Sequence, residues 1–455
     1  MATKAFDLMV IGTGTAGSTV ASRCRSAGWQ VAIVDSRPFG GTCALRGCDP
    51  KKVLVGAAEL IDWTHRMQGR GIRADGLRLD WPDLMAFKRT FTTPVPQNRE
   101  ESFAQAGIVT FHGRARCIGP TSVQVGNDML EGRHMVVATG AKPVALSIPG
   151  ASLVTTSEEF LELNELPPRI LFIGGGYISF EFSHVVARAG AQATILHRGA
   201  SPLEQFDRDL VAQLLQRTDQ IGIEVHLKAE VVGIVAGPGH LKVHATTHGE
   251  RRVFETDMVV HGAGRVADIE DLNLPAAGVK YDRRGVQVNR YLQSVSNPTV
   301  YAAGDAANSG GPPLTPIAGY GGEIVAANLL HGTSATANFL AVPSVVFTVP
   351  PLARVGLREE AAREQGLKFR TNHEVTSNWY SSRRIGEGCS GFKVLIEEGS
   401  EKLLGAHLLS PEASEVINLF ALAMRSKMAA ADLKDALLAY PTHGSDIEYM
   451  VGTGK

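Results

Sequence analysis

Two cysteines five residues apart are the side chains of this sequence best suited to redox chemistry. Cys43 and Cys48 lie in the segment GGTCALRGCDPKK, whereas Cys24, Cys117 and Cys389 are scattered along the 455 residues. A structural zinc site would need a second cysteine pair, and the sequence has none. The pair is therefore a candidate for redox chemistry, and we predict no metal site. The alternative is two buried, inert cysteines.

A disulfide within this segment would require a backbone conformation that differs from an ideal helix. On an ideal helix, residues five apart have Cα atoms roughly 8 Å apart, which is beyond the ~7 Å limit for a disulfide. A bridge between Cys43 and Cys48 therefore requires a distorted turn, and Gly47 offers the freedom for one.

A glycine turn near the N-terminus predicts a nucleotide site. The order of a strand in FDLMVIG, a helix in STVASRCRSAG and a second strand in WQVAIVDS is typical of a βαβ unit. Gly12 permits the tight turn, Gly14 lets the backbone approach a pyrophosphate, and Gly17 lets the helix pack on the strand. Asp35 ends the second strand, where it can accept a hydrogen bond from a ribose hydroxyl.

A second βαβ unit begins at Arg169 with RILFIGGGYIS and ends with AQATILHR. Its turn contains Gly174 and Gly176. The second strand ends at His197 and Arg198 instead of an acid, and Arg198 could pair with a 2′-phosphate. This ending favours NADP over NAD. The alternative is that the two residues form a solvated strand end.

The rest of the chain predicts further strands and a change of architecture. Residues 83–106 have a helical pattern, and residues 132–143 resemble a buried strand that runs into a glycine turn. From about residue 343, VVFTVPPLARVGL and GFKVLIEE alternate like antiparallel strands, and SEVINLFALAMRSK is an amphipathic helix. We expect a separate α+β domain there.

Composition excludes several classes of protein. The 45 basic and 46 acidic residues give a net charge of -1, which argues against nucleic acid or an anionic membrane surface as a partner. No run approaches the roughly 18 to 20 apolar residues of a membrane span. Five cysteines are too few for a disulfide scaffold, so we expect a reducing compartment, the cytoplasm.

Taken together, these motifs resemble the flavoprotein disulfide reductases, the family of glutathione reductase, dihydrolipoamide dehydrogenase and mercuric reductase. The resemblance extends over essentially the whole chain, because all the segments occur in order: VIGTGTAG, GGTCALRGCDPKK, ATGAKP, GGGYISFEF, GAGR, TVYAAGDA followed by LTPIA, and VVFTVPPLARVGL.

The resemblance implies a fold class and a division into domains. The fold would be α/β, with two Rossmann-like dinucleotide-binding domains, for FAD and NAD(P), plus a C-terminal α+β dimerisation domain. The FAD-binding domain would comprise residues 1–148 and 269–338, with the NAD(P)-binding domain at 149–268. Residues 339–455 would form the interface of a homodimer whose active site is shared between subunits.

The resemblance also implies two sets of cofactor-binding residues. Those that would hold FAD are Gly12, Gly14, Gly17, Asp35, Thr42, Lys51, Ala115, Thr139, Gly140, Asp305 and Ala318. Those that would hold NAD(P)H are Gly174, Gly176, Tyr177, Ile178, His197, Arg198 and Gly264.

Catalytic roles follow from the same resemblance. Cys48 would be the thiolate against the flavin, and Cys43 the outer thiol that attacks a small-molecule electron acceptor. Two thiols are needed because the attacking sulfur forms a mixed disulfide that its neighbour must resolve. Glu181 would pair with Lys51 near the flavin, and Tyr177 would gate the nicotinamide pocket.

The C-terminal segment AYPTHGSDIE departs from the family pattern of His-Pro-Thr followed by a glutamate. Tyr440 stands where the histidine is expected, and Ser445 where the glutamate would align. A phenol is a poor base at neutral pH, and it protonates a leaving thiolate less readily than an imidazolium does. His443 could substitute as the acid, or it could be a packing residue.

This departure leaves the acceptor open. We expect a reductase of a small disulfide, a metal ion or a quinone. One alternative is dihydrolipoamide dehydrogenase or glutathione reductase proper. Another is a metal reductase like mercuric reductase, although residues 450–455 lack the cysteine pair with which those enzymes capture the ion. The last is a catalytically idle dimeric binding protein.

Overall fold

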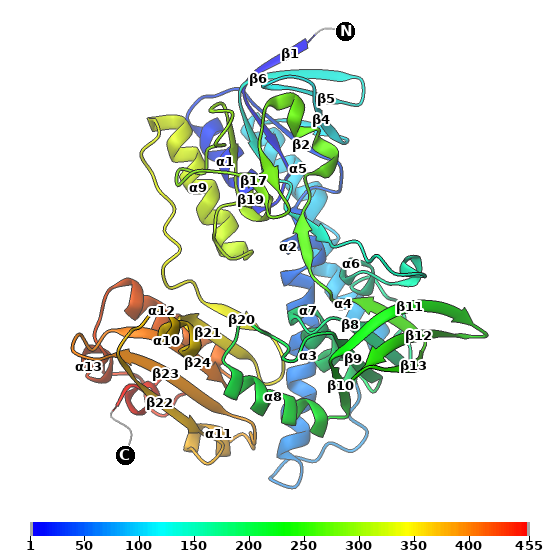
Figure 1. Ribbon diagram of the computed structural model, residues 1–455, viewed down its shortest axis with the longest axis vertical. Helices are drawn as coiled ribbons and strands as arrows, with labels where there is room; N and C mark the ends of the chain where they lie inside the picture. The colour runs from blue at the N-terminus through cyan, green and yellow to red at the C-terminus, as the bar shows by residue number, and fades with distance from the viewer. Residues whose placement is uncertain (1–2, 453–455) are drawn as a thin grey trace. The chain divides into compact units, whose positions relative to one another are not determined.

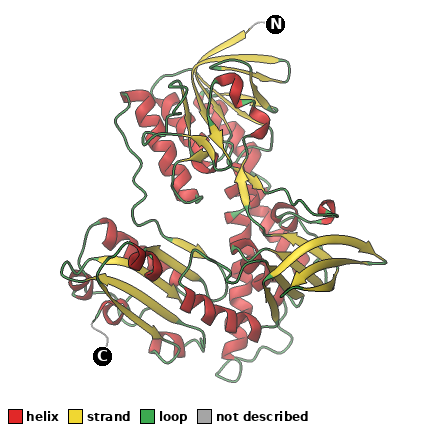
Figure 2. Cartoon of the chain, in the orientation of Figure 1, coloured by secondary structure: helices red, strands yellow, loops and turns green. Residues whose placement is uncertain are grey.

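The computed structural model describes residues 3–452, which form two compact units (Figures 1 and 2). Unit 1 comprises Met1–Lys51, Ala86–Ala145 and Gly264–Phe339, and unit 2 comprises Lys52–Met85, Leu146–Ala263 and Leu340–Lys455. Two of the boundaries fall inside helices, α3 (Cys48–Met67) and α4 (Trp81–Thr92). Residues 52–85, which the sequence placed in the FAD-binding domain, belong to unit 2.

Unit 1 is built on a sheet with parallel strands at its centre. β1 (Thr3–Ile11) pairs in parallel with β2 (Val31–Asp35) and with β6 (Asp128–Val137), and α1 (Thr15–Ser26) connects β1 to β2. The strand order is β3-β2-β1-β6-β5-β4, with β18 also paired to β6. Residues 8–11 of β1 are buried, as a strand covered on both faces requires. The first predicted βαβ unit is confirmed.

The remaining elements of unit 1 frame this sheet. α9 packs against α1 (Figure 1). The other helices and strands are α2 (Gly41–Arg46), α5 (Val95–Ala106), β3 (Val109–His112), β4 (Ala115–Cys117), β5 (Ser122–Val125), β7 (Ala141–Pro143), β15 (Arg265–Ala267), β16 (Tyr281–Asp282), β17 (Gly285–Gln287), β18 (Val300–Ala302), β19 (Ala307–Asn308) and α9 (Thr315–His331).

The helical pattern predicted over residues 83–106 is confirmed, with a break inside it. The structure has two helices there, α4, which ends at Thr92, and α5, which begins at Val95. Pro94 lies between them, and a proline has no N–H to donate to the preceding turn.

Unit 2 contains the second βαβ unit. β8 (Arg169–Ile173) and β9 (Gln192–His197) pair in parallel through α7 (Tyr177–Arg188), and the sheet order is β10-β9-β8-β14. Its further elements are α6 (Ser157–Phe160), α8 (Arg208–Gln220), β10 (Ile223–Leu227), β11 (Ala229–Gly237), β12 (His240–Thr247), β13 (Glu250–Thr256) and β14 (Met258–His261). The strands β11 to β13 form an antiparallel sheet.

The C-terminal part of unit 2 is an antiparallel sheet with helices, in the order β20-β21-β24-β23-β22. Its elements are β20 (Ser344–Val346), β21 (Leu352–Gly356), α10 (Glu359–Glu364), β22 (Phe369–Val375), α11 (Tyr380–Arg383), β23 (Gly391–Glu397), β24 (Leu403–Leu409), α12 (Ala413–Arg425), α13 (Ala430–Lys434) and α14 (Ile447–Val451). α12 buries its apolar face against β21 and β24. The predicted fold class is confirmed.

Candidate functional site

The cysteine segment is a helix break. α2 ends at Arg46, and α3 begins at Cys48. Gly47, between them, has φ -146° and ψ -111°, and a Cβ there would lie 3.0 Å from the carbonyl oxygen of Thr42. A larger residue would therefore disturb the turn. Both cysteines are free thiols, Cys43 partly buried and Cys48 exposed.

The two sulfurs differ in their affinity for a proton. A hydrogen bond from the Cys43 thiol lowers the pKa of Cys48 to about 6, with the Thr315 hydroxyl and the charge of Lys51 acting in the same direction against burial. The same hydrogen bond, followed by burial, raises the pKa of Cys43. Cys48 also starts α3, where the helix dipole favours an anion. At neutral pH the reduced pair is thus a Cys48 thiolate beside a Cys43 thiol.

Two residues next to these sulfurs, Thr315 and Asp49, were assigned no function from the sequence. The hydroxyl of Thr315, the first residue of α9, lies 3.4 Å from the Cys48 sulfur. The Asp49 carboxylate lies 3.8 Å from the Cys43 sulfur, within hydrogen-bonding range of its thiol. For Thr315 the available signal was the Thr-Pro pair, because a proline often stands in the first turn of a helix. For Asp49 the signal was a charge directly after Cys48.

The first glycine turn of unit 1 brings backbone segments into close approach. Gly12 has φ +111°, and a Cβ on it would lie 2.2 Å from the carbonyl oxygen of Ala138. A Cβ on Gly41 would lie 2.4 Å from the Cα of Gly14. No side chain caps the start of α1, so its first N–H groups are open to an anion.

The predicted ribose acceptor of this turn is held in place. Asp35 accepts hydrogen bonds from the backbone N–H and the hydroxyl of Thr13, at 2.9 and 2.6 Å, and from the N–H of Arg37 at 3.0 Å. A carboxylate has about four lone-pair sites, so one is left for a ligand hydroxyl.

The other residues of unit 1 also fit FAD. The Thr139 hydroxyl oxygen is buried and has no hydrogen-bond partner among residues 3–452, as expected of a group that bonds a ligand. A Cβ on Gly140 would meet open space. Burial raises the pKa of Asp305, in the short 3-10 helix Gly304–Ala306 that follows β18. The further FAD candidates in this unit are Gly17, Thr42, Ala115 and Ala318, and Gly264, which was expected to hold NAD(P)H, also belongs to unit 1.

The second glycine turn, in unit 2, repeats the first with one substitution. Gly174 has φ +106°, and a Cβ on it would lie 2.3 Å from the carbonyl oxygen of Gly262. Ser179 stands where the third glycine would fall, and its hydroxyl lies 2.0 Å from where a Cβ on Gly262 would be. Gly262 therefore makes room for the serine. Gly176 precedes α7, whose start has no side-chain cap and can receive a pyrophosphate.

His197 and Arg198 have different environments. The His197 ring accepts a hydrogen bond from the N–H of Gly175 at Nδ1, 3.1 Å away, and its Nε2 lies 3.0 Å from the carbonyl oxygen of Ser201. Both ring nitrogens are thus used within the protein, which fixes the glycine turn. Arg198 is exposed and remains the candidate for a 2′-phosphate.

The remaining candidates on α7 also lie in unit 2. Tyr177 is half exposed at the first helical position, followed by the partly buried Ile178. Glu181 is buried, and its carboxylate accepts a hydrogen bond from the N–H of Phe347 over 2.9 Å. Lys51 belongs to unit 1, so its pairing with Glu181 stays a prediction.

The C-terminal candidates differ sharply in exposure. Tyr440 is 79% exposed, whereas His443 is buried and its Nε2 has no hydrogen-bond partner in the described part of the chain. Burial, aided by the charge of Arg384, lowers the pKa of His443 to about 4. At neutral pH this histidine is uncharged and cannot act as an imidazolium acid.

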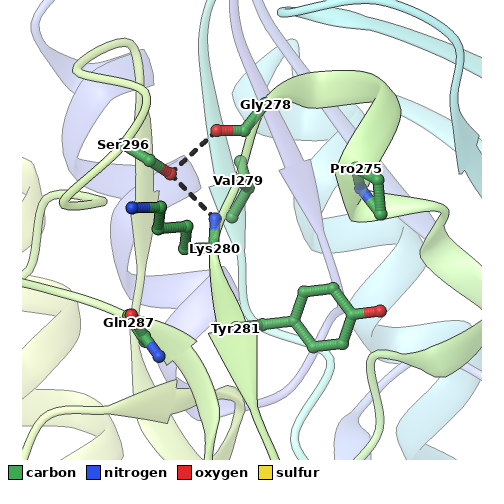
Figure 3. A pocket seen from close by; sticks show the side chains of 7 residues that line it. All are labelled: Pro275, Gly278, Val279, Lys280, Tyr281, Gln287 and Ser296. Atoms are coloured by element: carbon green, nitrogen blue, oxygen red, sulfur yellow. Dashed lines mark hydrogen bonds between the residues drawn. The ribbon is translucent and has the colours of Figure 1, made fainter.

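Outside the candidate site, the described residues supply no metal cluster and no membrane-spanning helix. A hollow of about 480 Å³ in unit 1 contains none of the candidate residues, and its Ser296 hydroxyl bonds within the protein, to the carbonyl oxygen of Gly278 and the N–H of Lys280 (Figure 3). Between residues 3 and 452, no cluster of three or more His, Cys, Asp or Glu side chains could hold a metal ion. No helix in this range has the length and hydropathy of a membrane span.

Known proteins with these features are similar to this chain over almost its full length. Residues 6–322 match the family described as pyridine nucleotide-disulphide oxidoreductase, and residues 342–451 match the dimerisation domain of that family. Glutathione reductase of Burkholderia cepacia is 32% identical over 96% of each chain. Mercuric reductase of Staphylococcus aureus is 30% identical over 96% of this chain and 80% of its own.

A solved structure has the same fold. The Cu(II) complex of a cysteine-to-serine mutant of RclA, an HOCl-induced flavoprotein disulfide reductase from Escherichia coli, superposes with a TM-score of 0.89. Its sequence is 27% identical, and the match covers 98% of this chain and 99% of that one.

Proposed function

Because this chain belongs to the pyridine nucleotide-disulphide oxidoreductase family, we propose that it passes electrons through Cys43 and Cys48 to a small acceptor other than glutathione or lipoamide disulfide. Members of the family are flavoprotein oxidoreductases that use FAD and NAD(P)H. The chemistry that bound FAD would supply is hydride acceptance from NAD(P)H and two-electron transfer to the cysteine pair. The family's dimerisation domain indicates a homodimer.

The observation that carries this proposal is the polarised cysteine pair. Cys48 starts a helix, lies 3.4 Å from the Thr315 hydroxyl and has its pKa lowered to about 6, chiefly by the Cys43 thiol. It is therefore a thiolate at neutral pH and can resolve a mixed disulfide formed at Cys43. Two inert cysteines would both have raised pKa values, as the buried Cys24 and Cys389 do.

The C-terminal segment supports the restriction on the acceptor. A large disulfide releases a thiolate that must be protonated, and an imidazolium does this more readily than a phenol. Tyr440 stands at the position of the family histidine, and His443 is neutral and buried. We propose that Tyr440 of each subunit serves the cysteine pair of the other as a hydrogen-bond donor only. Five cysteines are too few for a disulfide scaffold, which supports a reducing compartment, the cytoplasm.

A metal ion is the second candidate acceptor. The support is the Cu(II) complex of the RclA structure, together with the similarity to a mercuric reductase. Thiolates are soft ligands that suit such ions, and reducing an ion releases no thiolate leaving group. Tyr440 would therefore be sufficient for this reaction.

Anaerobic addition of NADPH to the purified flavoprotein tests the electron path. A long-wavelength thiolate-to-flavin absorbance band is expected, and Cys48→Ser should remove it and reduce acceptor turnover to background. A panel of glutathione disulfide, small disulfides, Cu(II) and quinones then identifies the acceptor. Flavin content serves as the control for folding, and a band that persists in Cys48→Ser would contradict the proposal. Protein that bound no flavin would favour the idle binding protein instead.

The nucleotide preference is tested at Arg198. If its guanidinium pairs with a 2′-phosphate, Arg198→Ala should raise KM for NADPH by about 10-fold, as the loss of one charge-assisted contact implies. KM for NADH should stay within about twofold, since NADH has no phosphate there. Equal effects on both nucleotides would mean that Arg198 does not read the 2′ position.

A further inference from the structure

Asp49 places a negative charge directly beside the outer sulfur of the pair. It is exposed in the first turn of α3, and its Oδ1 lies 3.8 Å from the Cys43 sulfur. The nearby Lys52 forms its ion pair with Glu59, 3.0 Å away.

The charges near the two sulfurs are distributed unequally. Lys51 stabilises the anionic form of Cys48, whereas Asp49 opposes the ionisation of both cysteines. In the proposed function the acceptor approaches Cys43, and the Asp49 carboxylate lies 3.8 Å from this sulfur. One unit charge about 4 Å away changes an equilibrium about fivefold in bulk water, and more where water is partly excluded.

We propose that Asp49 is a specificity-determining residue, which favours cationic over anionic acceptors at the Cys43 sulfur. This inference rests on the proposed function, in which Cys43 is the sulfur that meets the acceptor. It adds a substrate class, because a carboxylate at this distance attracts ammonium-bearing disulfides and repels disulfides that carry carboxylates.

For a disulfide acceptor the chemistry balances as follows. Cys43 loses its proton, its sulfur bonds to one acceptor sulfur, and the other acceptor sulfur leaves as a thiolate that takes up a proton. The Cys48 thiolate then attacks the Cys43 sulfur, which re-forms the intramolecular disulfide and releases the second thiolate. Two electrons pass from the cysteine pair to the acceptor. Asp49 acts on the first step, where negative charge develops on the leaving sulfur.

A chemical modification assay tests the inference without turnover. In a Cys48→Ser background, the rate of reaction at Cys43 is measured by mass spectrometry with two methanethiosulfonates, one bearing an ammonium group and the other a sulfonate. Asp49→Asn should lower the cationic-to-anionic rate ratio by about 10-fold or more. The ratio cancels any change in the intrinsic reactivity of the thiol, and it should approach unity as salt is raised.

Two control variants separate local from general effects. Asp83→Asn removes the same charge from the first turn of another helix, α4, and should leave the ratio unchanged. Asp49→Glu keeps the charge and should preserve most of the preference. An unchanged ratio in Asp49→Asn would overturn the inference, whatever the enzyme reduces.

Turnover of three disulfides by the complete flavoprotein distinguishes this inference from the proposed function. Cystamine is a dication, 2-hydroxyethyl disulfide is neutral and 3,3′-dithiodipropionate is a dianion. We expect kcat/KM to fall in that order, and Asp49→Asn to reduce the difference between the first and the last at least 10-fold. If Asp49→Asn shifts the modification ratio but the enzyme reduces none of the three disulfides, charge selection at Cys43 is supported. Disulfide reduction is then not the function.

Discussion

The reactive side chains have opposite environments in two segments of the molecule. These are the cysteine segment, residues 41–52, and the C-terminal segment, residues 439–446. In the first, Cys48 contacts the Thr315 hydroxyl and Cys43 contacts Asp49, so each sulfur has a polar neighbour. In the second, Tyr440 extends from the surface, and His443 is buried with one ring nitrogen unpartnered within the described residues.

The difference shows which part of the chemistry depends on the backbone and which on one side chain. The position of Cys48 at a helix start follows from the break at Gly47, and the lowered pKa follows from that position and from neighbouring groups. Proton transfer to an acceptor needs only a group of suitable pKa at one position. Tyr440 can replace a histidine there without altering the fold. Family membership therefore predicts the path of the electrons more reliably than it predicts the identity of the acceptor.

Tyr440→His is the strongest test of this difference. If the missing imidazole limits the enzyme with large disulfides, kcat/KM for glutathione disulfide should rise by about 100-fold, the typical contribution of a general acid or base. Steady-state rates with NADPH measure the change.

Tyr440→Phe is the matched control, because it keeps the ring and removes the hydroxyl. It should leave the low rate with glutathione disulfide unchanged within about threefold, as removal of one neutral hydrogen bond implies. If Tyr440→His had no effect, the binding of the acceptor would limit this reaction instead of its protonation.

The cysteine segment predicts a pH dependence of its own. The pKa of Cys48 is lowered to about 6, so the thiolate is present above that pH and is lost as the pH falls through it. The thiolate-to-flavin band of the reduced enzyme should therefore fade with a midpoint near pH 6. In Thr315→Ala the midpoint should rise by up to about one pH unit, which corresponds to the roughly 1.4 kcal/mol of one hydrogen bond to an anion.

Thr315→Ser keeps the hydroxyl and should keep the midpoint. A midpoint in Thr315→Ala that matches the unmodified enzyme would show that the Cys43 thiol and the helix start are sufficient to stabilise the thiolate.

The βαβ units and the cysteine pair were predictable because their signals are local. A strand, a glycine turn and a helix follow one another within about 30 residues, and parallel pairing of β1 with β2 and of β8 with β9 agrees with that order. Gly47 could be identified as the point of distortion because helix geometry alone excludes a disulfide across five helical residues. These inferences need no knowledge of distant contacts.

The rest of the site depends on contacts between residues that lie far apart in the sequence. Local sequence patterns do not predict such contacts. Thr315 reaches Cys48 across 267 positions, and only the packing of unit 1 brings them together. The role of His197 toward a nucleotide stays a prediction, and its ring bonds to the N–H of Gly175, which lies in the turn before it in the chain. A strand-end residue can serve the ligand or the turn, and residue type alone does not distinguish the two.

The smallest expected effect is at His443, and it addresses the alternative in which this histidine is the proton donor. Burial lowers its pKa to about 4, so the ring is neutral at pH 7 and cannot protonate a leaving thiolate as an imidazolium would. Its Nε2 is buried without a partner in the described residues, an arrangement that typically costs ~1–3 kcal/mol.

His443→Leu should therefore change kcat/KM for any acceptor by less than about twofold, because neither proton transfer nor a hydrogen bond is lost. The melting temperature should stay constant or rise, since an apolar side chain removes the unpaired nitrogen. Acceptor kinetics and thermal unfolding, measured on the same preparation, check both expectations. A collapse of turnover with an unchanged melting temperature would instead assign the acid role to His443 and restore the C-terminal segment to the function it has in the disulfide-reducing relatives.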